Sequence, residues 1–123
     1  MTHDLTIAVL DDDEGVRVSL TSLIRSLGYR VRCYASPTEF LADVAAPEPD
    51  CMISDIQMPE MSGDQLQAAL IVAGRSFPMI FMTAFPAPAT RDRVLAAGAR
   101  AFLVKPVSGD AIAHHLEAAL QPR

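Results

Sequence analysis

The sequence has little basic charge and almost no lysine. Its 123 residues carry ten Lys and Arg against fifteen Asp and Glu, which gives a formal net charge of -5, and Lys105 is the single lysine. Proteins that bind nucleic acid non-specifically do so through clustered Lys and Arg. The charge balance therefore argues against direct nucleic-acid contact by this chain.

Long hydrophobic runs are also missing. No uninterrupted apolar stretch approaches the roughly 20 residues that a membrane-spanning helix needs. The N-terminus, Met1–Asp4, lacks the basic segment followed by an apolar one that is typical of a signal peptide. We therefore expect a cytoplasmic protein with no membrane partner.

The sequence contains two cysteines and neither a repeat, a low-complexity tract nor a linker. A chain of this length buries about two-thirds of its unfolded surface, which is enough for a core without disulfide staples. We therefore expect one domain over residues 1–123, with no second domain in the chain.

What the sequence does have is a regular alternation of short apolar runs and amphipathic stretches. Short runs rich in β-branched and other apolar residues predict strands, and apolar residues at helical spacing predict helices. The predicted strands cover residues 5–10, 31–34, 51–54, 79–82 and 101–104. The predicted helices cover roughly 14–27, a short stretch after Ser36, a stretch ending near Gly74, a short stretch ending at Gly98, and roughly 108–120.

Local signals refine these boundaries. Ser36 followed by Pro37 and Glu39 predicts an N-cap, a first helical residue and a capping box. Residues 58–63 predict a loop, and Pro86 and Pro88 predict another. Residues 31–34 alternate apolar and polar, which is typical of a half-exposed strand at the edge of a sheet.

Five strands alternating with five helices predict an α/β fold with a parallel sheet covered on both faces. In such sheets, ligands bind outside the carboxyl ends of the strands. The residues at those ends are Asp11 and Asp12, Asp55, Thr83 and Lys105. Carboxylates held close together repel each other, and a hard divalent cation such as Mg²⁺ relieves that repulsion. A carboxylate beside Mg²⁺, a lysine and a threonine also suits phosphoryl transfer to an aspartate.

Four motifs carry a resemblance to a known family. They are Val9-Leu10-Asp11-Asp12-Asp13-Glu14, the stretch from Ser54 to Gly63, Met82-Thr83-Ala84 and Val104-Lys105-Pro106. Together they resemble the response-regulator receiver domain of two-component signalling, and the stretch from Asp55 to Gly63 is most similar to FixJ-type receivers. The resemblance covers essentially the whole chain. It implies a flavodoxin-like, doubly wound (βα)5 three-layer sandwich with a parallel sheet of order 2-1-3-4-5.

The resemblance implies a role for each matching residue. Asp55 matches the phosphoacceptor, and a sensor histidine kinase is the expected donor. Asp11, Asp12, Asp55 and the backbone carbonyl of Gln57 match the ligands of Mg²⁺, for which Mn²⁺ is a substitute. Thr83, Ala84, Lys105 and Phe102 match the residues that bind the phosphoryl group and switch with it, and the Lys105–Pro106 bond is expected to be cis.

Two further residues lie at family positions that tune loss of the phosphoryl group. These are Gln57, two residues after Asp55, and Phe85, two residues after Thr83. Phe85 is a candidate shield for the phosphoaspartate. Phosphorylation is expected to redistribute a two-state equilibrium in the surface built from the fourth helix, the fifth strand and the fifth helix. That surface would control homodimerisation or a downstream DNA-binding output domain.

The expected strand order also bears on the cysteines. Cys33 and Cys51 fall on the second and third strands, which the first strand separates. Two strand spacings are about 9–10 Å, beyond the reach of a disulfide, so both thiols are expected to be reduced.

Two other functions compete with this interpretation. Asp11 and Asp13 fit the first half of the D-x-D motif of haloacid-dehalogenase phosphatases, although Gly15 does not fit its next position. An atypical receiver that acts only as a phosphorylation-independent interaction module is the second alternative. The receiver interpretation implies no enzyme beyond self-phosphorylation and autodephosphorylation.

Overall fold

The computed structural model describes residues 4–121, which form five parallel strands alternating with five helices. The strands are β1 (Thr6–Leu10), β2 (Arg30–Tyr34), β3 (Cys51–Asp55), β4 (Met79–Thr83) and β5 (Ala101–Val104). The helices are α1 (Glu14–Ser26), α2 (Pro37–Ala42), α3 (Gly63–Val72), α4 (Pro88–Ala96) and α5 (Gly109–Leu120). The sheet order is β2-β1-β3-β4-β5, as predicted.

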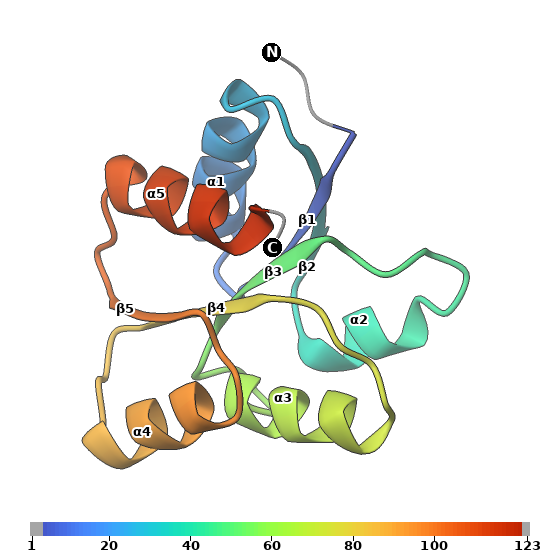
Figure 1. Cartoon of the computed structure of the whole chain (residues 1–123), viewed down its shortest axis with the longest axis vertical. Coiled ribbons are helices and arrows are strands. Elements are labelled where there is room, and N and C mark those ends of the chain that lie inside the picture. The colour runs from blue at the N-terminus through green and yellow to red at the C-terminus, as the bar shows by residue number, and fades with distance from the viewer. Residues whose placement is uncertain (1–3, 122–123) are drawn as a thin grey trace.

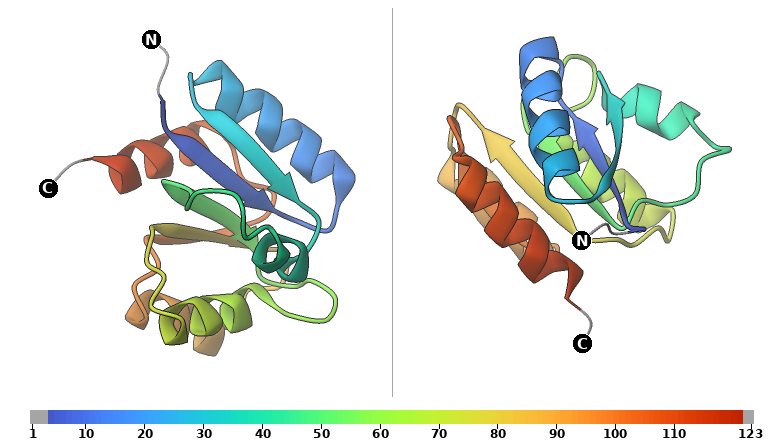
Figure 2. Two further views of the ribbon diagram at one scale, coloured as in Figure 1. Left: turned by 90° about the vertical axis from the view of Figure 1, so that its right-hand side faces the viewer. Right: turned by 90° about the horizontal axis from the view of Figure 1, so that it is seen from above.

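The sheet separates two helical layers. Helices α1 and α5 lie on one face, and α2, α3 and α4 lie on the other (Figures 1 and 2). Among the described residues, none of these helices combines the length and apolar character needed to cross a bilayer.

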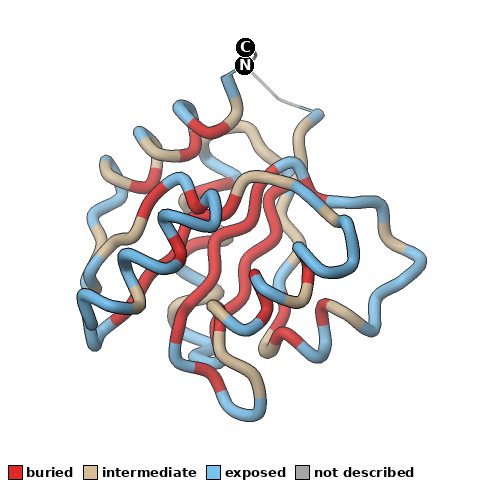
Figure 3. Tube along the Cα trace, turned by 60° about the horizontal axis from the view of Figure 1, so that its bottom comes forward, coloured by how far each residue is buried: buried red, intermediate tan, exposed pale blue. Residues whose placement is uncertain are grey.

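Strand side chains alternate between two cores, because successive residues of a strand point to opposite faces. In β1, Ile7 and Val9 pack with α1 and α5, whereas Ala8 and Leu10 pack with the other three helices. Strands β3 and β4 are buried along their whole length (Figure 3). Because both faces are covered, these strands are apolar except for Ser54 and Asp55 at the end of β3 and Thr83 at the end of β4. Polar side chains are rarely buried in such strands without hydrogen-bond partners or a function.

Strand β2 occupies one edge of the sheet and is partly exposed, as its alternating sequence predicted. Cys33 on β2 pairs in register with Val9 of β1, and Cys51 on β3 pairs with Ile7 of the same strand. Both cysteines are free, and strand β1 separates them as predicted.

Two helix starts differ from the prediction. Pro88 does not lie in a loop but is the first residue of α4, which has no side-chain N-cap bond. Proline suits that position because the first helical N–H has no partner within the helix and proline lacks one. The loop predicted over 58–63 ends one residue early, since Gly63 begins α3.

The complete capping box also lies elsewhere than predicted. Ser36 accepts a bond from the Glu39 backbone, but the reciprocal pair of bonds is made by Ser62 and Gln65 at the start of α3. A glutamine can close the box as well as a glutamate. Helix α3 is therefore the one among the described helices whose N-terminus has both hydrogen bonds of a capping box.

Candidate functional site

The candidate site lies at the carboxyl edge of the sheet, where polar side chains end or directly follow four of the strands. Asp11 directly follows β1, Asp55 and Thr83 end β3 and β4, and Lys105 directly follows β5. Parallel strands bring all four residues to one edge. Asp11 and Thr83 are fully buried, and Asp55 is 5% exposed.

Three carboxylates form a cluster. Asp11, Asp12 and Asp55 each offer an oxygen, and these oxygens all lie within 4.8 Å of one another. Asp12 is exposed, whereas the other two are buried, so the cluster opens to solvent on one side. In residues 4–121, this is the one group of three or more potential metal-ligating residues.

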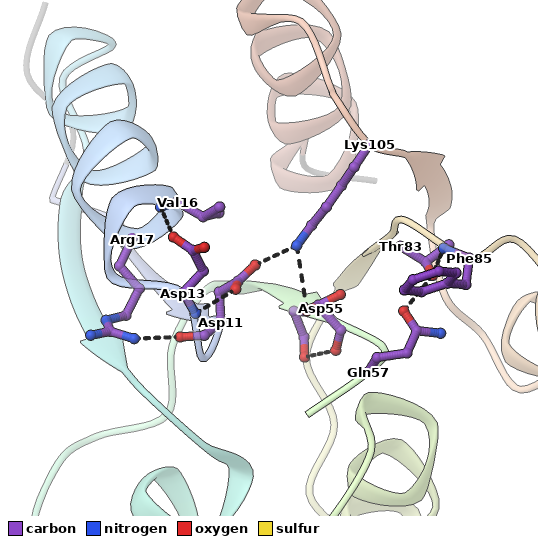
Figure 4. Close-up of polar contacts among 10 residues, drawn as sticks. Asp11, Asp13, Val16, Arg17, Asp55, Gln57, Thr83, Phe85 and Lys105 are labelled. Atoms are coloured by element: carbon purple, nitrogen blue, oxygen red, sulfur yellow. Dashed lines mark hydrogen bonds and ion pairs between the residues drawn. The ribbon is translucent and has the colours of Figure 1, made fainter. Parts of the chain in front are cut away.

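Lys105 supplies the positive charge next to the two buried carboxylates, Asp11 and Asp55. Its Nζ lies 2.9 Å from Asp11 Oδ2 and 3.4 Å from Asp55 Oδ2 (Figure 4). Burial acts to lower the pKa of Lys105, but its hydrogen bond to Asp11 and the charges of Asp55 and Asp11 outweigh burial and raise that pKa. The lysine therefore remains a cation at neutral pH.

One lysine does not neutralise three carboxylates. Burial, and then the charge of Asp11, raises the pKa of Asp55 above its usual range. Within residues 4–121, Asp55 Oδ1 is also the one buried side-chain oxygen or nitrogen atom without a hydrogen-bond partner. A buried, unpartnered carboxylate oxygen beside two further carboxylates fits a hard divalent cation, whose preferred ligands are oxygens.

Thr83 makes hydrogen bonds to two residues near the site. Its hydroxyl donates to Gln57 Oε1 over 2.6 Å and accepts from the Phe85 backbone N–H over 3.0 Å. Gln57 is exposed and lies in the loop after β3. Figure 4 shows its side chain reaching toward Thr83.

The remaining predicted residues lie around this edge. Phe85 is 72% exposed, and Ala84 lines a hollow between α1 and the segment after β5, together with Lys105 and Pro106. Phe102 is partly buried against the core on the α2, α3 and α4 side. The Lys105–Pro106 bond is cis, as predicted.

Two further residues support the site, and the sequence had suggested a role for neither of them. Arg17 on α1 donates to the Asp11 backbone carbonyl over 2.7 Å and so fixes the strand end that carries Asp11. Gly63 packs its Cα against the Asp55 carbonyl so closely that a Cβ would overlap that oxygen. Gly63 could have been noticed in the sequence because a glycine follows Ser62 in the family motif. No local sequence pattern distinguishes Arg17 from the other arginines.

Asp13 has a structural role. Its carboxylate accepts a hydrogen bond from the Val16 N–H and caps α1. The phosphatase alternative needed Asp13 as the second acid of its motif, and this capping bond accounts for that acid instead.

Comparison with known proteins decides the family. The model described as "Response regulator receiver domain" matches residues 7–117. This chain belongs to that family. The receiver is 39% identical to the response regulator protein TmoT of Ectopseudomonas mendocina over 104 residues, which cover 85% of this chain and 47% of that protein.

Other relatives agree with this assignment. The receiver is 36% identical to the transcriptional regulatory protein TdiR of Thauera aromatica over 116 residues, or 94% of this chain and 51% of that protein. It superposes on the crystal structure of FixJ-N with a TM-score of 0.86 and 29% identity, covering 97% of this chain and 95% of that one. The chain thus spans about half the length of these curated relatives. Its family is one of signalling domains rather than classical enzymes.

The raised pKa of Asp55 predicts an unusual pH dependence of stability. An acid whose pKa is higher in the folded state disfavours folding once it ionises, so stability should fall as pH rises from the ordinary Asp pKa of about 3.9 through the raised one. Without divalent cations at neutral pH, Asp55→Asn should therefore have a higher free energy of unfolding than the wild type. Urea unfolding with a chelator, repeated over a pH series, measures this difference.

The control is Asp92→Asn on α4, which removes a carboxylate of which 69% of the side chain is exposed. We expect it to change stability by no more than about 0.5 kcal/mol. Equal stability of Asp55→Asn and the wild type at every pH would contradict the prediction.

Proposed function

We propose that this receiver accepts a phosphoryl group on Asp55 from a phosphohistidine of a sensor histidine kinase. The observation that carries the proposal is the state of the Asp55 carboxylate, which is buried, has one unpartnered oxygen and lies 3.4 Å from Lys105. A carboxylate in this setting is poorly solvated, and poor solvation favours its action as a nucleophile.

The transfer forms one bond, between oxygen and phosphorus, and breaks one bond, between nitrogen and phosphorus. An Asp55 oxygen attacks phosphorus, and the new O–P bond forms as the N–P bond of the phosphohistidine breaks. The phosphohistidine is protonated on its other ring nitrogen, so the leaving group is a neutral imidazole that keeps this proton. Lys105 offsets negative charge on the phosphoryl oxygens, and Asp11 holds Lys105 in place through their 2.9 Å contact. Asp55 is thus the nucleophile, and Lys105 is its fixed electrostatic partner.

Receiver domains generally bind Mg²⁺ in an acidic pocket, and the carboxylate cluster fits that ion. We propose that Asp11, Asp12, Asp55 and the Gln57 backbone carbonyl would hold Mg²⁺, with Mn²⁺ as a substitute. Bound there, the ion supplies positive charge that neutralises the carboxylates and the incoming phosphoryl oxygens.

We propose that phosphorylation then changes the contacts of Thr83, Ala84 and Phe102. Phosphoryl oxygens accept hydrogen bonds from the Thr83 hydroxyl and the Ala84 backbone, and the rearrangement shifts the surface formed by α4, β5 and α5. Gln57 and Phe85 flank the phosphoryl position and tune its hydrolysis by water.

The relatives support a proposal for the output of the switch. The chain spans about half of TmoT and of TdiR, and TdiR is named a transcriptional regulatory protein. We propose that the switched surface controls homodimerisation or a DNA-binding output domain, and that signalling takes place in the cytoplasm. The receiver itself has a net charge of -5, so DNA contact is assigned to the output domain.

Acetyl phosphate with Mg²⁺ tests the proposal. We expect a Mg²⁺-dependent mass increase of one phosphoryl group, mapped to Asp55 after trapping, and no such adduct in Asp55→Asn. Rapid turnover of acetyl phosphate that survives Asp55→Asn would favour a phosphatase. Absence of any Mg²⁺-dependent adduct would favour the phosphorylation-independent interaction module.

A further inference from the structure

The Gln57 side chain engages the one hydroxyl proton of Thr83. Thr83 is fully buried, and its Oγ1 is bonded on both sides, donating to Gln57 Oε1 and accepting from the Phe85 N–H. The donor–acceptor distance of 2.6 Å to Gln57 is at the short end for a hydroxyl bond. The hydroxyl therefore has a defined partner before any phosphoryl group arrives.

A threonine hydroxyl carries one proton to donate, and phosphoryl oxygens only accept. Thr83 cannot donate to Gln57 and to a phosphoryl group at the same time. The Phe85 N–H cannot accept the Thr83 proton in place of either group, because it is itself a donor to Thr83. The two acceptors therefore compete for one proton.

We propose that Gln57 is a positioning residue that holds Thr83 in the unphosphorylated arrangement and so sets how readily the switch responds. This inference rests on the proposed phosphorylation of Asp55. It concerns the equilibrium between two arrangements of Thr83 before phosphorylation. The role proposed above for Gln57 concerns the rate at which water removes the phosphoryl group afterwards. The Gln57 backbone carbonyl, proposed as a metal ligand, has no part in this competition.

The balance of the two bonds gives the expected size of the effect. A bond to a charged phosphoryl oxygen is roughly twice as strong as a neutral one, so the exchange is favourable. Breaking the Gln57 bond still opposes it by the net contribution of one neutral hydrogen bond, which corresponds to about 3- to 10-fold in affinity. Removing the Gln57 acceptor should therefore increase affinity for a phosphoryl mimic by that factor.

Gln57→Met tests this competition because methionine keeps the length of the side chain and removes the amide acceptor. The probe is beryllofluoride with saturating Mg²⁺, titrated into the receiver while backbone amide resonances are followed by NMR. We expect the dissociation constant of Gln57→Met to be about 3- to 10-fold lower than that of the wild type. A second variant, Gln57→Ala, should change it in the same direction.

The control is the same substitution in a Thr83→Val background, which keeps the shape of the side chain and lacks the hydroxyl. If the hydroxyl carries the effect, Gln57→Met should leave the dissociation constant of Thr83→Val unchanged. An equal gain in both backgrounds would show that Gln57 acts by another route and would overturn the inference. An unchanged or weaker affinity in the wild-type background would overturn it as well.

The failure of the inference can be told apart from failure of the proposed function. If wild-type receiver binds beryllofluoride but Gln57→Met has no Thr83-dependent effect, only the inference fails. If neither beryllofluoride nor acetyl phosphate acts at Asp55, the proposed function fails with it. Urea unfolding of each variant checks that the fold is kept, which we expect because Gln57 is exposed.

Discussion

Gly63→Ala is expected to destabilise the receiver by about 3 kcal/mol or more, the upper range for overpacking at a site that cannot relax. Gly63 is the first residue of α3, and a Cβ there would overlap the Asp55 carbonyl oxygen. The obstacle is backbone rather than the end of a flexible side chain. The Gly63 N–H also donates to the Ile56 carbonyl over 2.8 Å, so the two segments cannot separate without losing that bond.

The same substitution should impair the site, because the displaced carbonyl belongs to the proposed phosphoacceptor. We expect urea unfolding to show a lower midpoint and acetyl phosphate labelling of Asp55 to fall in the fraction that remains folded.

Gly109→Ala is the matched control. Gly109 is likewise the first residue of a helix with a serine N-cap, but a Cβ there would make ordinary contacts of 3.5 and 3.6 Å with Leu23. We expect its free energy of unfolding to stay within about 0.5 kcal/mol of the wild type. Equal stabilities of the two alanine variants would contradict the explanation by close approach.

Asp11→Asn is expected to weaken Mg²⁺ binding by about 10- to 100-fold, the range for loss of a group that supports a metal site. Asp11 is fully buried, belongs to the carboxylate cluster and holds Lys105. Asparagine keeps the shape of the side chain but removes its charge. Mg²⁺ titration followed by NMR measures the affinity, and acetyl phosphate labelling of Asp55 should fall in parallel.

Asp13→Asn separates this effect from a change in net charge. It removes one negative charge from the same loop, and asparagine caps a helix about as well as aspartate. Because the Asp13 carboxylate caps α1 through Val16 and is exposed to solvent that screens its charge, we expect Mg²⁺ affinity to change by less than about threefold. A similar loss of affinity in both variants would show that overall charge rather than ligation governs binding.

Most of the architecture could be predicted because its signals are local. The apolar run of β3 ends at Ser54 and Asp55, and that of β4 ends at Thr83. Parallel strands bring such ends to the same edge of the sheet. Helix starts were less predictable: the box predicted at Glu39 is completed by Gln65, and Pro88 opens α4. Each of these residue types occurs both in loops and in the first turn of a helix, and the packing of the helix determines which of the two it adopts.

The sequence by itself determined the strands, the helices and the polar residues at the carboxyl edge of the sheet, because their signals are periodic or local. The order of the strands was predicted only through the resemblance to receiver domains. Only the tertiary structure decided that the Thr83 hydroxyl bonds to Gln57, and that Gly63 presses on the Asp55 carbonyl. It also decided that Arg17 supports the Asp11 carbonyl. The physical reason is that these contacts join segments from different elements. Whether two such groups form a hydrogen bond depends on differences in distance of a few tenths of an ångström, and these are determined only when the layers have packed.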